Sequence, residues 1–190
     1  MNINLEKNRE VMIENQLKPN KITNTEILGI FNQISKENFI SKDKINVCYS
    51  DQDISVKDSR GYLKNLHLAQ ILHFAEISSH EKILHIGGLT GYLSVLISKL
   101  CNEIYVTDDN EDCLEDIIKN FRDNKVNNGY VYKSKFSEGL KKKEPFVKIY
   151  TWKTTVHFNR WLERIKISKR KPMFLETTIY AIVHFALISA

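Results

Sequence analysis

Glycine, proline and cysteine are scarce in this sequence. Its 190 residues include seven glycines, three prolines and three cysteines. So few glycines and prolines exclude a flexible linker or a low-complexity tract. The cysteines are Cys48, Cys101 and Cys113, and no two of them form a C-x-x-C pair. Their odd number and their spacing exclude a disulfide framework and a zinc knuckle, so we expect reduced, mostly buried thiols.

Long hydrophobic runs are also missing, with one exception. The apolar stretch from Ile179 to Ala190 is shorter than the ~20 residues needed to cross a bilayer, and it contains His184. The opening stretch, MNINLEKNREVMIEN, carries charge throughout and lacks the apolar core of a secretory signal peptide. We expect a buried strand or helix at 179–190, no membrane contact and a cytoplasmic location.

Patterns of metal ligands are absent as well. The six histidines show no H-E-x-x-H or other ligand spacing. The acidic run from Asp108 to Asp112 lacks the glycine and the downstream glutamate of a calcium loop. The sequence therefore predicts no metal. Beyond Asp108, this run is typical of a helix N-terminus, where negative charge is favourable.

Positive charge is concentrated in one part of the chain. Between Lys133 and Pro172 there are 13 Lys and Arg residues and only three acids. Such a stretch can bind nucleic acid, but more often it is a solvated surface. Neither an aromatic-rich RNA-binding signature nor a helix-turn-helix pattern accompanies it. We expect no nucleic-acid partner.

The periodicity of apolar residues predicts an N-terminal helical region followed by an α/β region. Helices are expected at 4–18, from about Thr23 to Ser35 and from Leu66 to Ile77, with an irregular loop from Lys36 to Lys64. The expected strands are Lys82–Gly87, Glu103–Thr107, Gly129–Lys133 and Phe146–Trp152, and the expected helices between and after them are Tyr92–Leu100, Asn110–Arg122 and His157–Ile167. This alternation predicts a parallel sheet with helices on both faces. We expect one domain, with residues 1–80 as a helical cap and substrate-side loop and residues 81–190 as a cofactor-binding sheet.

The stretch KILHIGGLTGY contains the candidate ligand loop. Its apolar strand ends at Gly87, and Gly88 and Gly91 follow before the next helix. Ligands of parallel sheets bind at the carboxyl ends of strands near a helix N-terminus, and glycines let them approach the backbone closely. Asp108 ends the next strand, about 20 residues after the first glycine, where an acid can accept both hydroxyls of a ribose.

Two classes of ligand suit this geometry. A dinucleotide requires G-x-G-x-x-G, which GGLTGY does not supply. S-adenosylmethionine needs only a turn wide enough for its amino-acid end and an acid for its ribose. The loop is nearer to this second pattern.

Several short motifs occur in the order and spacing of a known family. The stretch ILHIGGLTGY aligns without gaps with a family loop, VLEIGTGSGY, and CYSDQDISV matches a tyrosine–acid segment. Residues 9–40 are similar to a region of two short helices leading to a "vPRe.F" segment, here Ile34–Phe39. The stretch EGLKKKEPFVKIY is similar to "G…aPFD.I.v". Over Arg9–Val147 the chain thus resembles the protein-L-isoaspartate O-methyltransferases, particularly bacterial ones.

This resemblance implies a fold, a cofactor and a reaction. The fold would be α/β, with a Rossmann-like sheet of the S-adenosylmethionine-dependent methyltransferase type behind N-terminal helices. The enzyme would methylate isoaspartyl carboxylates of damaged proteins, using S-adenosyl-L-methionine, as a monomer. His85, Gly87, Gly88, Leu89 and Gly91 would line the methionine end of the cofactor, and Asp108 would hold its ribose. No catalytic side chain is assigned.

The sequence departs from the family pattern at several positions. His85 replaces an acid, Leu89 replaces the middle glycine of the loop, and Leu63 stands where the family has a substrate-facing serine. An acidic "gDG" turn of the family reads Ser134-Lys135-Phe136 here. By itself, His85 is more typical of a buried core histidine than of a catalyst.

Three interpretations of present function therefore stay open. The first is an active methyltransferase, and the second is an inactive descendant that serves as a binding or structural protein. The third and least favoured is a basic protein that associates with nucleic acid. After Val147 the resemblance fades, which is consistent either with a shortened set of C-terminal strands or with a divergent subfamily.

Overall fold

The computed structural model describes residues 4–57, 60–135, 140 and 148–151. In this part of the chain no helix is long and apolar enough to span a membrane. Nor do these residues include a group of three His, Cys, Asp or Glu side chains placed to hold a metal ion. The expected helix His157–Ile167 and the apolar stretch 179–190 lie outside the described residues.

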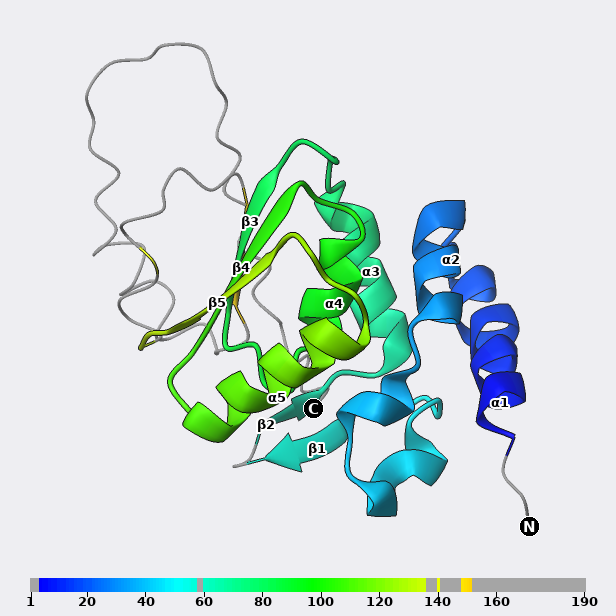
Figure 1. Ribbon diagram of the computed structural model, residues 1–190. Coiled ribbons are helices and arrows are strands. Elements are labelled where there is room, and N and C mark those ends of the chain that lie inside the picture. The colour runs from blue at the N-terminus through cyan, green and yellow to red at the C-terminus, as the bar shows by residue number, and fades with distance from the viewer. Residues whose placement is uncertain (1–3, 58–59, 136–139, 141–147, 152–190) are drawn as a thin grey trace, which may run out of the picture.

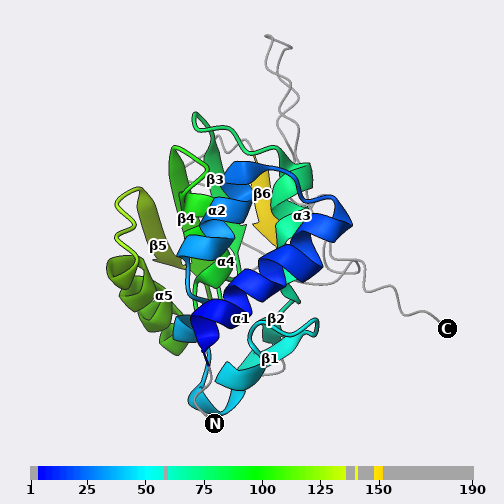
Figure 2. The same cartoon turned by 90° about the vertical axis from the view of Figure 1, so that its right-hand side faces the viewer.

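A four-stranded parallel sheet forms the centre of the fold (Figure 1). Its strands are β3 (Lys82–Ile86), β4 (Glu103–Asp108), β5 (Gly129–Lys133) and β6 (Lys148–Thr151), in the order β5-β4-β3-β6. The connecting helices α4 (Tyr92–Ser98) and α5 (Glu111–Asp123) confirm the predicted alternation. Together with α3 (Asn65–Ala75) they lie on the same face of the sheet (Figures 1 and 2).

The direction in which the chain crosses the sheet changes at β3. From β3 the chain adds β4 and then β5 on one side, and β6 later pairs with the other side of β3. In open α/β sheets ligands bind at such a switch point, beyond the carboxyl ends of the strands. The loop after β3 therefore occupies the position at which a ligand is expected.

Two N-terminal helices pack against each other, and the second helix and the turn that continues the first pack against α3 (Figure 2). The first, α1 (Leu5–Met12), continues through a π-helical turn (Ile13–Leu17) into a 3₁₀ turn (Lys18–Asn20) that contains Pro19. The second, α2 (Thr25–Gln33), begins after Asn24, whose side-chain oxygen accepts hydrogen bonds from the N–H groups of Glu26 and Ile27. Both expected helices are confirmed, although the end of the first is not α-helical.

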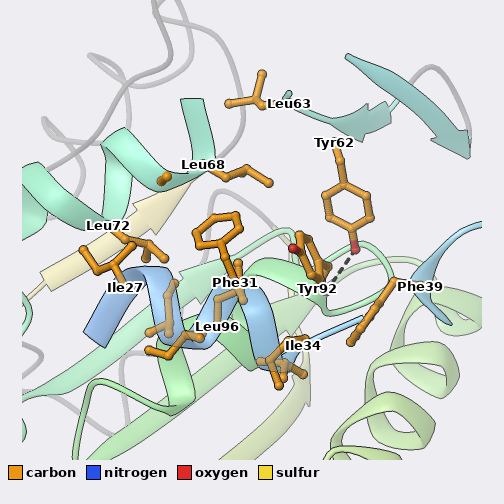
Figure 3. Packing of buried hydrophobic residues seen from close by; sticks show 14 of the residues in the cluster. Ile27, Phe31, Ile34, Phe39, Tyr62, Leu63, Leu68, Leu72, Tyr92 and Leu96 are labelled. Carbon is orange, nitrogen blue, oxygen red and sulfur yellow. Dashed lines mark hydrogen bonds between the residues drawn. The ribbon is translucent and has the colours of Figure 1, made fainter. Parts of the chain in front are cut away.

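The hydrophobic core lies among these helices and the sheet. Figure 3 shows Phe31 of α2, Leu72 of α3 and Leu96 of α4 in one cluster, and all three are almost completely buried. The expectation for the cysteines is also confirmed, because Cys48, Cys101 and Cys113 are free and buried.

The prediction of an irregular loop from Lys36 to Lys64 was wrong in its second half. Strands β1 (Ile54–Lys57) and β2 (Arg60–Tyr62) form an antiparallel hairpin there, below α5 in Figure 1. Two 3₁₀ segments, Lys36–Phe39 and Lys42–Val47, precede the hairpin. Strands of three or four residues are too short to produce a clear alternation of apolar and polar residues, which explains the error.

The two strands of this hairpin approach each other very closely at Gly61. A Cβ atom at this position would lie 2.1 Å from the carbonyl oxygen of Ile54 and 2.8 Å from the Cα atom of Ser55. Both are backbone atoms of the opposite strand, so they cannot move aside without breaking the pairing. Glycine is therefore required between Arg60 and Tyr62.

One charged side chain lies inside the core. Lys36 is completely buried, and its ammonium group donates hydrogen bonds to the carbonyl oxygen of Leu63 (3.2 Å) and to Asn65 Oδ1 (2.9 Å). It also lies 5.9 Å from the ring centroid of Tyr62 and 5.6 Å from that of Tyr92. None of these four partners carries a negative charge. Burial therefore lowers the pKa of Lys36 to about 8.

This buried lysine predicts a specific pH dependence of stability. The ordinary pKa of 10.5 applies to the unfolded chain, so below pH 8 both states are charged and the cost of burying the charge is fully present. As pH rises from 8 to 10.5 the folded state loses its proton first, and stability rises. In Lys36→Met this gain is absent. Urea unfolding of both proteins measures this effect. Between pH 7 and pH 10 the free energy of unfolding of the wild type should rise by about 2 kcal/mol relative to that of Lys36→Met. A constant difference would contradict the lowered pKa.

Candidate functional site

The loop that follows β3 is folded tightly onto the end of β4. The N–H groups of Gly87 and Gly88 donate to the carbonyl oxygen of Thr107, at 2.7 and 3.2 Å, and the N–H of Gly91 donates to the carbonyl of Gly88 at 2.8 Å. Gly87 and Gly91 have φ angles of 85° and 87°, a region that favours glycine. The predicted strand–turn–helix arrangement is present, and the first two N–H groups of the turn are bonded to β4.

Gly88 is required by packing between the loop and its neighbours. A Cβ atom there would lie 2.5 Å from Val106 Cγ1 and 2.7 Å from Ile117 Cδ1. Both side chains are completely buried, so they have little freedom to move aside. The glycine thus allows the loop to contact β4 and α5.

Leu89 holds an unusual backbone conformation in the middle of the loop. Its φ angle is 55°, in the left-handed region that costs a residue with a Cβ atom about 1–2 kcal/mol. Its side chain is 2% exposed and belongs to the hydrophobic core. Burial of this side chain therefore offsets the backbone strain.

His85 is a buried member of β3 with its own partner. It is 3% exposed, and its Nδ1 atom lies 2.7 Å from Ser94 Oγ on α4. Burial lowers the pKa of this imidazole to about 4, so it is neutral at pH 7. This environment agrees with the interpretation as a core histidine. Its predicted contact with a cofactor stays a prediction.

Asp108, the predicted ribose-binding residue, is surrounded by hydrogen-bond donors. Arg60 Nη1 lies 3.0 Å from Oδ1 and Arg60 Nη2 lies 2.6 Å from Oδ2. The N–H of Asn110 donates to Oδ1 and that of Leu89 to Oδ2, both at 3.1 Å. Burial opposes ionisation, but these donors and the charge of Arg60 outweigh it and hold the pKa of Asp108 below its ordinary value. The group is therefore a carboxylate that accepts four hydrogen bonds.

Arg60 comes from the hairpin that the sequence analysis missed. Two residues further along β2, Tyr62 Oη accepts a hydrogen bond from the N–H of Tyr92 at 3.0 Å, as Figure 3 shows. Thr90 Oγ1 donates its only proton to the carbonyl of Phe39 (2.7 Å), so Tyr62 must donate across the 2.6 Å that separates it from Thr90 Oγ1. Burial raises the pKa of Tyr62 to about 12. The hairpin is thus anchored to the loop and to the start of α4.

The other sequence motifs lie at the edge of this arrangement. Leu63, which stands at the position of a substrate-facing serine, is 7% exposed. The N–H of Ser134 donates to the carbonyl of Asp108 at 3.0 Å, so the predicted turn after β5 does lie beside the site. Phe136 lies outside the described residues. Asn110, within the acidic run, caps α5 by accepting from the N–H of Cys113, as expected for a helix N-terminus.

A separate cavity of about 290 Å³ opens between the hairpin and α5. It is lined by residues 38–41, Val56, Lys57, Thr90, Asp116, Lys119 and Asn120. The lining contains one loop residue, Thr90, and neither Asp108 nor a loop glycine. This cavity is therefore distinct from the predicted ribose position.

A family model matches most of this chain. The family model described as protein-L-isoaspartate(D-aspartate) O-methyltransferase matches residues 6–157. A protein-L-isoaspartate O-methyltransferase of Brucella anthropi is 26% identical over 143 residues, which are 75% of this chain and 65% of that protein. A second, from Pelobacter propionicus, is 26% identical over 102 residues, which are 54% of this chain and 45% of that protein. The chain spans about half the length of several such relatives.

Solved structures agree on the fold. A protein-L-isoaspartate O-methyltransferase structure has a TM-score of 0.65 at 18% identity, covering 75% of this chain and 47% of that one. A Plasmodium falciparum structure, described as such a methyltransferase in complex with S-adenosyl-L-homocysteine, has a TM-score of 0.65 at 14% identity, covering 77% and 74%. The described residues thus have the Rossmann-like α/β fold of S-adenosylmethionine-dependent methyltransferases, as predicted.

The strained backbone at Leu89 predicts an unusual order of stability among variants. Both Leu89→Ala and Leu89→Gly lose the buried side chain, but only glycine relieves the left-handed strain. We expect the free energy of unfolding of Leu89→Gly to exceed that of Leu89→Ala by about 1 kcal/mol. Leu96, buried in α4, is the control, because there the alanine variant should be the more stable by about 1 kcal/mol. Urea unfolding measures all four, and the same order at both sites would argue against strain at Leu89.

Proposed function

Because the chain belongs to the protein-L-isoaspartate(D-aspartate) O-methyltransferase family, we propose that it transfers a methyl group from S-adenosyl-L-methionine to isoaspartyl carboxylates of damaged proteins. The observation that carries the proposal is the meeting of the loop and the acid at the switch point of the sheet. The N–H of Leu89 in the loop after β3 donates to the carboxylate of Asp108 at the end of β4. This is where the fold binds ligands.

The side chains of this site suit an adenosyl ligand in part. Asp108 is ionised and belongs to the residue type that accepts two hydroxyls of a ribose. In this proposal Gly87, Gly88, Leu89 and Gly91 lie along the methionine end, since they form the turn beside the carboxylate. His85 is neutral, so it offers a hydrogen bond there but no charge to balance an amino group.

The reaction itself places few demands on side chains. S-adenosyl-L-methionine would supply a methyl group bound to a positively charged sulfur. An oxygen of the substrate carboxylate would bond to the methyl carbon as the sulfur–carbon bond breaks and S-adenosyl-L-homocysteine leaves. The protein has to align the two groups and keep water away from them. Asp108 orients the cofactor from the sheet, and the anchored hairpin covers the same edge through Arg60 and Tyr62.

A second function is favoured by one specific observation. Both oxygens of Asp108 are bonded to Arg60, and the middle position of the loop carries the buried side chain of Leu89. The charged groups of this site already have partners within the protein. A descendant that no longer binds the cofactor can therefore keep the site without losing stability. The alternative is therefore an inactive family member that acts as a binding or structural protein.

Calorimetric titration with S-adenosyl-L-homocysteine separates the two. The proposal predicts binding in the micromolar range that Asp108→Asn abolishes, because an amide cannot accept both ribose hydroxyls. The matched control is Asp109→Asn, which changes the exposed neighbouring acid and should leave the affinity unchanged. Circular dichroism has to show that each variant is folded. If the folded wild type releases no heat at millimolar ligand, the alternative stands.

Substrate use requires a second measurement. A protein that binds the cofactor should incorporate tritiated methyl groups into a peptide containing isoaspartate, and not into the same peptide containing aspartate. Equal labelling of both peptides would contradict the proposed substrate while leaving cofactor use intact.

A further inference from the structure

We infer that Arg60 competes with the cofactor for Asp108 and thereby determines the affinity of the site. This inference rests on the proposed function, because it concerns the same carboxylate. Arg60 bonds both carboxylate oxygens, at 3.0 and 2.6 Å, with the two nitrogens of its guanidinium end. A ribose needs those oxygens for its two hydroxyls. The two partners therefore exclude each other.

Arg60 supplies two of the four hydrogen bonds on Asp108, and it is the partner that can be exchanged. The other two bonds come from backbone N–H groups, one in the glycine loop and one at the start of α5. Removing either would require refolding of the loop or of the helix end. The guanidinium group needs only a rotation of its own side chain. That side chain is 20% exposed, so it reaches solvent on one side, whereas that of Asp108 is fully buried.

The hairpin holds Arg60 in place against the sheet. Tyr62, two residues further along β2, is bonded to Thr90 and to the N–H of Tyr92. On β1, Lys57 Nζ lies 2.5 Å from Asp112 Oδ2 at the start of α5. Gly61 brings β1 and β2 into backbone contact between these anchors. The anchored strand β2 therefore positions Arg60 next to Asp108.

The competition has a defined thermodynamic form. The apparent dissociation constant equals the intrinsic one divided by the fraction of molecules in which Arg60 has left Asp108. Two hydrogen bonds between charged groups in a partly buried setting change an equilibrium constant by about ten- to a hundredfold. The wild type should bind that much more weakly than a protein in which Asp108 is free.

The test is a titration of full-length variants with S-adenosyl-L-homocysteine. Arg60→Gln should bind about ten- to a hundredfold more tightly than the wild type, because a neutral amide competes poorly for the carboxylate. Arg60→Lys keeps the charge but cannot bond both oxygens in the planar fork, so it should give a smaller gain. The lysine variant also keeps the test open if the glutamine variant fails to fold. The control is Lys82→Gln at the start of β3, the end of the strand away from the loop. Its exposed ion pair with Glu103 should change the affinity by less than about twofold.

Each outcome has one meaning. Equal affinities for the wild type, Arg60→Gln and Arg60→Lys would overturn the competition while leaving the proposed cofactor use intact. Weaker binding by Arg60→Gln would show that Arg60 assists the ligand, which also overturns the inference. No binding by any folded variant would remove the proposed function itself.

Discussion

The carboxylate of Asp108 is the point at which four separate segments of this chain meet. It ends β4, accepts hydrogen bonds from the loop after β3 and from the N–H of Asn110 just before α5, and binds the arginine of β2. A buried carboxylate without partners is costly, whereas one with four donors is stable as an anion. The hairpin, the loop after β3 and the segment that leads into α5 are thus all hydrogen-bonded to this one charge.

The same arrangement gives the site two possible uses, which differ only in the partner of one side chain. When Arg60 is bonded to Asp108, the carboxylate has all its hydrogen-bond partners within the protein and needs no ligand. With Arg60 displaced, an ionised carboxylate lies beside a glycine loop, which is what an adenosyl ligand requires. The structure describes the first state, with Arg60 bonded to Asp108. The family to which the chain belongs is the reason to consider the second.

Much of the fold could be predicted from the sequence because its signals are local. Runs such as KILHI and EIYVTD are short, apolar and bounded by turns, and Asn24 and Asn110 stand where helices begin. The position of Asp108 followed from the same reasoning. The hairpin could not be predicted in this way, since Gly61 is required by a contact with a strand that has no pattern of its own. Arg60 was missed with it, because an arginine in an apparent loop carries no sign of a buried partner nearly fifty residues away.

The strand order also determines how this sheet can form during synthesis. β3 is an interior strand, but its second neighbour is β6, and the whole of α4, β4, α5 and β5 lies between them in the sequence. Until the ribosome has released Thr151, Ile83 to Ile86 present an open row of backbone N–H and C=O groups. Such a row pairs readily with other chains, and non-local parallel pairing is slow. During synthesis there is therefore an interval in which one edge of β3, the most apolar strand of the sheet, is unpaired. A holdase chaperone would prevent aggregation most effectively during this interval.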